Sequence, residues 1–549
     1  MDCVKLIFFM LYPFLCQLAL SSSSPHLCPK DEALALLQFK HMFTVNPNAS
    51  DYCYDITDQE NIQSYPRTLS WNNSIDCCSW NGVHCDETTG QVIELDLRCS
   101  QLQGKFHSNS SLFHLSNLKS LDLAYNNFSG SLISPKFGEF SGLAHLDLSH
   151  SSFTGLIPAE ISHLSKLHIL RIALNVLNLR SNNLEGTIPQ CLGKMNICKL
   201  DLSNNSLSGT INTNFSIGNQ LRVISLHGNK LTGKVPRSLI NCKYLTLLDL
   251  GNNQLNDTFP NWFGDLPHLQ IFSLRSNKFH GPIKSSGNTN LFAQLQILDL
   301  SSNGFSGNLP ISLFGNLQAM KKIDESTTPH YVSDQYVGYY DYLTTITTKG
   351  QDYDSVQILD SNMIIDLSKN RFEGHIPGII GDLVGLRTLN LSHNVLEGHI
   401  PTSLQNLSVL ESLDLSSNKI SGEIPKQLES LTFLEVLNLS HNHLVGCIPT
   451  GKQFDSFENS SYQGNDGLHG FPLSTHCGGD DRLGSSSHGL WLWTCYWTVR
   501  NIHNVVNSIS SMVFEVGCEI GTQNYYENEK ARGKILVCNN LQNSSLQSC

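Results

Sequence analysis

The cysteines are the residues of this sequence whose spacing allows the most chemistry, either as thiolate metal ligands or as disulfides. Five lie ahead of a long repetitive region and two behind it: Cys28, Cys53, Cys77, Cys78 and Cys85, then Cys447 and Cys477. A zinc site at Cys77, Cys78 and Cys85 is the alternative, but no second ligand pair at the usual spacing of two to four residues recurs nearby. The pattern favours disulfides that close the two ends of the repetitive region.

The sequence contains no recognisable arrangement of catalytic residues. Its 22 histidines are scattered, and it has no Gly-x-Ser-x-Gly, His-Glu-x-x-His, P-loop or protein-kinase motif. Lys321 and Lys322 stand beside Asp324 and Glu325, a group typical of a solvated turn. With 15% charged residues and a net charge of -12, the composition also argues against nucleic-acid binding. We therefore expect neither an enzyme nor a bound metal or cofactor.

The first 22 residues indicate export from the cell. Lys5 precedes about 15 apolar residues and then a serine-rich stretch, which is the pattern of a secretory signal peptide. An uncleaved N-terminal anchor is the alternative, but Pro13 interrupts a short apolar run. We expect residues 23–91 to form an N-terminal cap in an oxidising compartment.

Sequons for N-glycosylation agree with export. Besides one at Asn543, they lie at Asn48, Asn72, Asn109, Asn127, Asn204, Asn214, Asn256, Asn390, Asn406, Asn438 and Asn459. Because the chain is rich in Asn and Ser, several sequons would arise by chance. They support secretion without establishing it.

From Val92 the sequence repeats a unit of the form LxxLxLxxNxLxGxIPxxLxxLxx, mostly at a spacing of 24 residues. Nine units lie within residues 92–317 and four within 362–457. A period of 24 residues falls in the range of leucine-rich repeats and outside that of ankyrin or helical repeats. We therefore predict a right-handed leucine-rich-repeat superhelix, an α/β-type solenoid with a concave parallel β-sheet and disulfide-bonded caps.

One unit shows how its residues divide between core and surface. Leu248 and Leu250 alternate with Leu247 and Asp249, which predicts a short strand with the first pair inward and the second pair outward. Asn253 stands where this strand ends. The same offset holds Asn in 11 of the 13 units, and Ser100 and Ser151 are the exceptions. A buried amide there can hydrogen-bond the backbone that leaves the sheet, so we predict a scaffold role for it.

Outward strand positions merge into one continuous surface in such a stack, and this surface is the natural binding site. Seven polar residues at these positions are candidates for ligand contact: His145, Ser149, Arg180, Lys199, His227, Arg275 and Lys369. Each one alone is more typical of a solvated surface residue. Only a contiguous stripe would indicate a site.

Two segments depart from the repeat. Residues 167–173 begin a unit, but the next unit already begins at Leu174. Either one of the two strands is vestigial or a block of repeats has been lost at this junction, and we favour the loss. Residues 318–361 form an island that holds six of the chain's 16 tyrosines, among them Tyr331, Tyr336 and Tyr340. Tyrosines give stiff, amphipathic contact area, which favours recognition over a self-packed loop.

Several features together resemble the plant leucine-rich-repeat receptor-like proteins: the signal peptide, the DCCSWNGVHC cap, the LxGxIP units, the island four repeats before the end, and GNDGLHGFPLSTHCG. The stretch KGQDYDSVQILDSNMIIDLSKNRFEGHIP resembles the tomato leaf-mould resistance group within that family. The resemblance implies a cell-surface immune receptor that senses a pathogen-derived protein or peptide. Intact members cross the plasma membrane once and lack a kinase, so receptor kinases act as their adaptor and co-receptor.

The resemblance also implies roles for individual residues. It pairs Cys28 with Cys77, Cys78 with Cys85, and Cys447 with Cys477 in the caps, and it leaves Cys53 and Cys99 unassigned. Lys349, Gly350 and Tyr353 match the island motif of the family. The four closing repeats correspond to the co-receptor side, and residues 458–480 to the C-terminal cap.

This chain departs from the family in two ways. It has fewer repeats than its members usually carry, which indicates that a central, ligand-selecting part is missing. In residues 481–549 the longest apolar stretch, Gly489 to Val499, has 11 residues, too few to cross about 30 Å of hydrocarbon. Residues His488 to Gly521 can be back-translated into permitted codons. When these codons are read one base later, they encode a stretch of 18 residues without charge. We therefore interpret the tail as a membrane anchor whose reading frame has shifted. We expect it to be disordered and the product to be secreted into the apoplast.

Two other functions stay open from the sequence. A secreted inhibitor of pathogen wall-degrading enzymes has the same type of repeat, and a soluble decoy would also lack an anchor. A truncated, non-functional product is the third reading, favoured by both departures.

Overall fold

The computed structural model describes residues 27–51, 53, 64–166, 176–284, 292–323, 343–349, 351–357, 361–451 and 453–473. They belong to one unit, Met1–Cys477, and the second unit, Gly478–Cys549, lies outside the described residues. The predicted signal peptide, the fragment at 167–173 and the aberrant tail therefore also lie outside them. None of the described helices has the length and apolar character that a membrane span requires.

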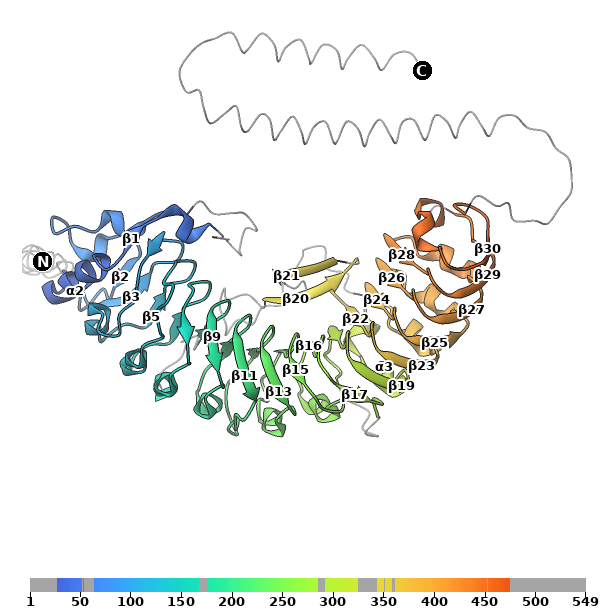
Figure 1. Ribbon diagram of the computed structural model, residues 1–549, viewed down its shortest axis with the longest axis horizontal. Helices are drawn as coiled ribbons and strands as arrows, with labels where there is room; N and C mark the ends of the chain where they lie inside the picture. The colour runs from blue at the N-terminus through green and yellow to red at the C-terminus, as the bar shows by residue number, and fades with distance from the viewer. Residues whose placement is uncertain are drawn as a thin grey trace, which may run out of the picture. The chain divides into compact units, whose positions relative to one another are not determined.

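The predicted parallel sheet is present and runs through the whole described array (Figure 1). It has 14 strands in the described residues, of which the first, β2 (Val83–Cys85), is antiparallel to its neighbour. The others are β3 (Val92–Asp96), β5 (Ser120–Asp122), β6 (His145–Asp147), β8 (Val176–Asn178), β10 (Lys199–Asp201), β12 (Val223–Ser225), β14 (Leu247–Asp249), β16 (Ile271–Ser273), β18 (Ile297–Asp299), β22 (Ile364–Asp366), β24 (Thr388–Asn390), β26 (Ser412–Asp414) and β28 (Val436–Asn438). These 13 parallel strands correspond to the 13 units expected from the sequence.

The sheet continues across both irregular segments. Strand β6 pairs in register with β8, so that His145 lies beside Val176 although 31 residues separate them. Strand β18 pairs in register with β22 across the island, with Asp299 beside Asp366. Neither interruption therefore breaks the concave surface.

A second set of strands, which we call the lateral strands, follows the turn after each concave strand. They form one sheet of β7 (Thr154–Gly155), β9 (Asn183–Gly186), β11 (Ser206–Thr210), β13 (Lys230–Gly233) and β15 (Gln254–Leu255). A second sheet contains β17 (His280–Gly281), β19 (Gly304–Asn308), β23 (Arg371–His375), β25 (Val395–Gly398), β27 (Lys419–Glu423), β29 (His443–Cys447) and β30 (Gly467–His469). The repeat pattern predicted the concave strands but not these sheets.

Glycine in the lateral strands permits close stacking of successive coils. Gly398 has a φ of 78°, and a Cβ built there would lie 2.6 Å from Nδ1 of His375 in the preceding coil. Any other residue would be strained by this backbone conformation and would clash with the imidazole. After most lateral strands the chain returns through a 3-10 turn, such as η12 (Thr402–Asn406), or, after β19, through α3 (Ile311–Asn316).

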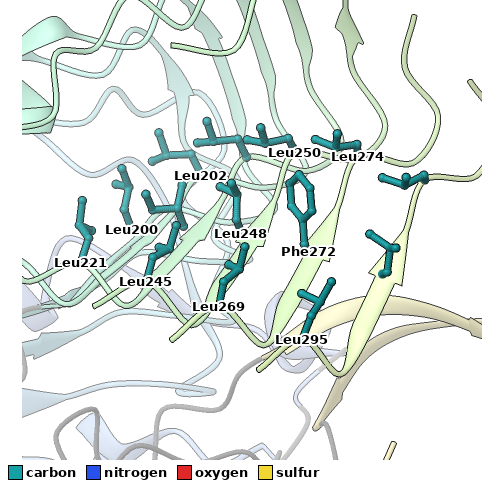
Figure 2. Close-up of a cluster of buried hydrophobic side chains, with 14 of the residues drawn as sticks. Leu200, Leu202, Leu221, Leu245, Leu248, Leu250, Leu269, Phe272, Leu274 and Leu295 are labelled. Atoms are coloured by element: carbon teal, nitrogen blue, oxygen red, sulfur yellow. The ribbon is translucent and has the colours of Figure 1, made fainter. Parts of the chain in front are cut away.

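The leucines of the inward face form one continuous core (Figure 2). Leu248 and Leu250 are fully buried, as predicted, and Leu255, Phe259 and Leu266 of the same coil join them. Figure 2 shows the labelled side chains of successive coils in rows, so that each coil packs on the next. A coil therefore depends on its neighbours for its burial.

The asparagine at the end of each strand has the predicted scaffold role. Asn253 donates from Nδ2 to the carbonyl oxygens of Leu226, Leu250 and Gly251 at 2.9–3.2 Å, and its Oδ1 accepts from the Leu231 amide at 3.0 Å. Ser151, one of the two exceptions, donates to the Leu123 and Ser149 carbonyls instead. The amide ladder thus connects each coil to the one before it.

The N-terminal cap contains α2 (Lys30–Lys40) and three disulfides in the described residues. Oε2 of Glu32 in α2 accepts a hydrogen bond from the Val92 amide at 2.7 Å, at the start of the first parallel strand. Trp71 and Trp80 stack with ring centroids 5.5 Å apart. The cap therefore covers the exposed end of the core, as a terminal repeat requires.

Two of the disulfide pairings implied by the resemblance are confirmed: Cys28–Cys77 and Cys78–Cys85. These bonds also exclude zinc coordination by the same thiols. Cys53, which was left unassigned, pairs with Cys99. Cys447 is disulfide-bonded, and its expected partner Cys477 lies outside the described residues.

Candidate functional site

The outward residues of the concave sheet form three rows that run across the strands. We call them the first, second and third outward rows, and in β14 and its following loop they are represented by Leu247, Asp249 and Gly251. Strand registers place each residue beside its counterpart in the next repeat. Because these strands are in register, a chemical feature that recurs becomes a continuous stripe.

The middle of the first outward row is apolar. It consists of Val223, Leu247, Ile271, Ile297 and Ile364, one from each of five successive strands. These residues form a cluster of their own, separate from the leucine core, and are 0–4% exposed. The concave face therefore carries an apolar stripe next to its polar rows, although the sequence analysis singled out polar residues alone.

The second outward row is mostly acidic. Its members are Asp96, Asp122, Asp147, Asn178, Asp201, Ser225, Asp249, Ser273, Asp299, Asp366, Asn390, Asp414 and Asn438. In most aspartates one carboxylate oxygen accepts the backbone amide two residues on; Oδ1 of Asp249, for example, accepts from the Gly251 amide at 2.9 Å. This contact fixes the direction of each carboxylate.

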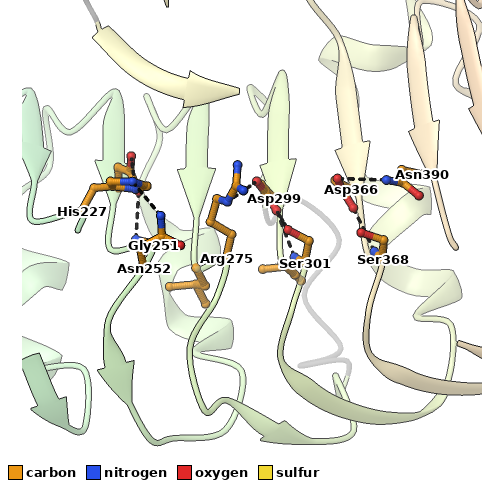
Figure 3. A network of polar contacts seen from close by, with 12 residues as sticks. His227, Gly251, Asn252, Arg275, Asp299, Ser301, Asp366, Ser368 and Asn390 are labelled. Atoms are coloured by element: carbon orange, nitrogen blue, oxygen red, sulfur yellow. Dashed lines mark hydrogen bonds and ion pairs between the residues drawn. The ribbon is translucent and has the colours of Figure 1, made fainter. Parts of the chain in front are cut away.

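A polar network occupies the centre of the concave face (Figure 3). Nδ1 of His227 lies 3.4 Å from Oδ2 of Asp249, and Nε2 lies 3.0 Å from Nδ2 of Asn252. Burial works against the charged imidazole, but the Asp249 carboxylate outweighs it and raises the pKa of His227. Nε of Arg275 lies 3.9 Å from Oδ2 of Asp299. Two of the seven predicted contact residues therefore belong to one network.

Asp366 is a buried carboxyl group of the same outward row. Its Oδ1 accepts from the Ser368 amide at 2.9 Å, and its Oδ2 accepts from Nδ2 of Asn390 at 3.2 Å. Burial, together with the neighbouring Asp299 carboxylate, raises the pKa of Asp366 to about 7. Asp366 therefore titrates far above the ordinary range of an aspartate.

The structure buries most of the predicted contact residues more deeply than the sequence suggested. His145, Ser149, Arg180, Lys199 and His227 are 3–7% exposed, and Arg275 is mostly buried. Lys369 is exposed and has a left-handed backbone, with a φ of 52°. Neighbouring strands bring side chains of the same row together, so an outward residue buries itself against its counterparts. The expectation of solvated surface residues is therefore wrong for the five buried ones.

Near the N-terminal end, aromatic and cationic side chains stack along the same edge of the concave sheet. The rings of Tyr125 and His150 lie 4.4 Å apart and nearly parallel, and the Arg98 guanidinium lies 5.1 Å from the centre of the Tyr125 ring. Burial, followed by the charge of Arg180, lowers the pKa of His150 to about 4. This stack connects three repeats. Tyr125 and His150 hold the same position in consecutive units, three residues after Asp122 and Asp147, and Arg98 lies one position earlier in its unit.

The described part of the island contains the 3-10 helix η10 (Ala319–Lys321) and a hairpin of β20 (Leu343–Thr348) and β21 (Gln351–Gln357). Nζ of Lys349, at its turn, lies 3.0 Å from Oε2 of Glu411 and 2.7 Å from Oε2 of Glu435. Arg387 also pairs with Glu411. The island is therefore tied to the closing repeats by a residue of its sequence motif.

The other island residues singled out from the sequence are not positioned by the structure. Tyr331, Tyr336, Tyr340 and Gly350 lie outside the described residues. Tyr353 belongs to β21, but its side chain is not described. Their role in recognition stays a prediction.

The eleven sequons within the described repeats and caps differ in accessibility. Asn48, Asn72, Asn109, Asn204, Asn214, Asn256, Asn406 and Asn459 are exposed, whereas Asn127, Asn390 and Asn438 are partly buried. Asn390 and Asn438 donate from Nδ2 to Asp366 and Asp414 of the preceding repeats. The nitrogen that would carry a glycan is thus already used within the second outward row.

Comparison with known families identifies leucine-rich repeats along the chain. The Leucine rich repeat N-terminal domain matches residues 29–52 and 59–86. The Leucine rich repeat models match residues 117–138, 142–164, 173–195, 196–216, 219–279, 294–317, 360–420 and 433–459. These ranges agree with the cap and the repeats observed.

The chain is also similar to whole plant receptor-like proteins. It is 50% identical over 791 residues to Receptor-like protein Cf-9 of Solanum pimpinellifolium, covering 88% of this chain and 92% of that protein. It is 47% identical over 794 residues to Receptor-like protein Cf-9 homolog of Solanum lycopersicum, with the same coverage. About 483 residues of this chain, 88% of 549, take part in the alignment of 791 positions with Receptor-like protein Cf-9. At the other positions, about 300, that protein has a residue and this chain has none.

Among solved structures, the crystal structure of PEPR1-AtPEP1 is similar in fold. The TM-score is 0.52 at 24% identity, and the match covers 80% of this chain and 59% of that one. This similarity supports the leucine-rich-repeat fold.

Proposed function

The chain belongs to the plant leucine-rich-repeat receptor-like proteins, the family of Receptor-like protein Cf-9, and we propose that it is a receptor ectodomain for a pathogen-derived protein or peptide. The ligand binds on the concave sheet. The chain has no enzymatic activity of its own, so a response depends on partner receptor kinases. Secretion places it in the apoplast.

The contrast between the two faces of the concave strands carries this proposal. Inward positions repeat leucine almost without change, as the core requires. The third outward row, by contrast, varies from β3 to β16, with Arg98, Ala124, Ser149, Arg180, Ser203, His227, Gly251 and Arg275, and is serine from Ser301 to Ser440. A scaffold needs no such variety, whereas a surface that selects one ligand gains specificity from it.

The large unmatched portion of the relatives' sequences limits what this chain can recognise. About 300 positions correspond to roughly a dozen coils at 24 residues each. We place this difference at the junction between β6 and β8, where 31 residues replace the usual spacing. The ligand of this chain therefore differs from that of a receptor with the full array.

The second candidate function is a secreted inhibitor of pathogen wall-degrading enzymes. The second outward row favours the inhibitor less than the receptor. Its carboxylates Asp249, Asp299 and Asp366 are deeply buried and already accept hydrogen bonds from backbone amides of the chain itself. The island hairpin and its attachment to the closing repeats favour the receptor.

A pull-down of the secreted chain, with and without co-expressed leucine-rich-repeat receptor kinases, tests the proposal. A receptor is expected to retain a kinase and to leave fungal polygalacturonase active. Inhibition of the polygalacturonase without retention of any kinase would replace the receptor with the inhibitor.

A further inference from the structure

One place on the concave face combines a histidine with a run of aspartates. Among the 13 described parallel strands, the first outward row has a single histidine, His145 in β6. The second outward row has three consecutive aspartates on β3, β5 and β6: Asp96, Asp122 and Asp147. The histidine therefore lies beside the longest run of carboxylates in that row.

The side chains of Asp122, His145 and Asp147 converge. One ligand atom from each lies within 4.8 Å of the other two. Asp122 and Asp147 are in register on neighbouring strands, and His145 precedes Asp147 by two residues, so that both point to the same face. His145 and Asp147 are each 5% exposed. These two residues are thus well shielded from solvent, and Asp122 is partly buried.

Hydrogen bonds from outside the cluster orient its carboxylates. Oδ1 of Asp122 accepts from the Ala124 amide at 2.8 Å, and Oδ1 of Asp147 accepts from the Ser149 amide at 2.8 Å. Nδ2 of Asn178, on the next strand, donates to Oδ2 of Asp147 at 2.9 Å. Outer contacts of this kind hold ligands in place around protein-bound metals.

We propose that Asp122, His145 and Asp147 form a binding site for a divalent transition-metal ion, with Zn²⁺ as the fitting example. One imidazole nitrogen and two carboxylate oxygens are a donor set that zinc accepts at about 2.0–2.2 Å. A hard ion such as Ca²⁺ takes six to eight oxygen ligands and has no preference for imidazole. The ion would join β5 to β6 on the concave face.

The electrostatics of the cluster agree with this assignment. Burial lowers the pKa of His145 to about 4 and outweighs the attraction of the Asp147 carboxylate, which raises it. The charge of Lys199 also lowers this pKa. Burial and the carboxylates of Asp147 and Asp96 raise the pKa of Asp122. A cation placed among these groups would relieve the repulsion.

Isothermal titration of the metal-free, full secreted chain with ZnCl₂ tests the site. We expect one saturable site that Zn²⁺ occupies and that excess CaCl₂ does not displace. His145→Gln and Asp122→Asn should each weaken this binding at least tenfold. His393→Gln, which changes an exposed histidine outside the cluster, should leave it unchanged.

A thermal melt of each variant without metal shows whether it is folded, and the metal-induced rise of the melting temperature gives a second readout. The rise should be present in the wild type and in His393→Gln and lost in His145→Gln. Equal zinc affinity in the wild type and both cluster variants would overturn the proposal. Equal competition by Ca²⁺ would also overturn it, because it would indicate a general acidic surface.

Discussion

Lys349 lies 2.7 Å from Glu435, 86 residues further along the chain, and 3.0 Å from Glu411. Burial works against the ionised form of Glu411, but hydrogen bonds from Lys349 and Arg387 outweigh it and lower its pKa. The hydrogen bond that Nζ of Lys349 donates to Glu435 is the main cause of the raised pKa of Lys349. The shifts of Lys349 and Glu411 agree in direction, and we regard the contacts of Lys349 with both glutamates as the attachment of the island hairpin.

Lys349→Glu is expected to release the hairpin, because it places a third carboxylate beside Glu411 and Glu435. Hydrogen–deuterium exchange in β20 and β21 should become faster, and the double variant with Glu435→Lys should restore part of the protection. Lys419→Glu, on an exposed position of β27, is the matched control. Unchanged exchange in Lys349→Glu would show that the ion pairs do not hold the hairpin.

Leu250→Ala is expected to lower the free energy of unfolding by about 2–5 kcal/mol, because it leaves a cavity in the fully buried core. Ser225→Ala, on the outward side of a neighbouring strand, removes one hydroxyl and should have little effect. Urea denaturation of the secreted variants measures both changes. Similar losses would contradict the assignment of inward and outward positions.

Asp366→Asn is expected to reduce the dependence of stability on pH. The carboxyl has a pKa of about 7 in the folded chain and about 3.9 in an unfolded one. The folded state thus binds the proton more tightly, and the stability contributed by this group is greatest below about pH 4 and is lost as the pH rises through about 7. The variant has no proton to lose there.

Melting temperatures across this pH range measure the effect. The wild type should lose more stability between about pH 4 and pH 7 than Asp366→Asn does. Asp265→Asn, at an exposed position, should follow the wild type. Parallel curves for the wild type and Asp366→Asn would show that Asp366 does not titrate in this range.

Three sequons with the same Asn-Leu-Ser sequence should differ in glycosylation. Asn406 is exposed, whereas Oδ1 of Asn390 accepts from Ser392 and Oδ1 of Asn438 accepts from Ser440 within the concave sheet. Mass spectrometry of tryptic glycopeptides should find a glycan on Asn406 and none on the other two. Full occupancy at Asn390 would mean that its bond to Asp366 is absent in the mature protein.

The 24-residue period was enough to predict the coils, the concave strands and the role of the strand-end asparagines, since each follows from a local pattern. Asn253 forms the predicted contacts with loop backbone. The lateral sheets were missed because short segments such as β15 become strands only when a neighbouring coil, here the preceding one with β13, pairs with them. No local signal marks that pairing.

The candidate site was harder to predict for the same reason. Sequence reasoning selected His145 and Lys199 as outward, but their burial depends on side chains from neighbouring repeats. The partner of Lys349 could not be found either, since Glu411 and Glu435 have ordinary positions in their units. Contacts between residues far apart in the chain require the register of the whole stack.

Histidine footprinting with diethyl pyrocarbonate tests most directly whether the concave sheet is the binding surface. His393 follows concave strand β24, and His399 follows lateral strand β25 of the same repeat, and both are exposed. When the secreted chain is incubated with pathogen culture filtrate and a co-expressed receptor kinase, labelling of His393 should fall while that of His399 stays constant. Protection of His399 with unchanged labelling of His393 would contradict recognition on the concave face.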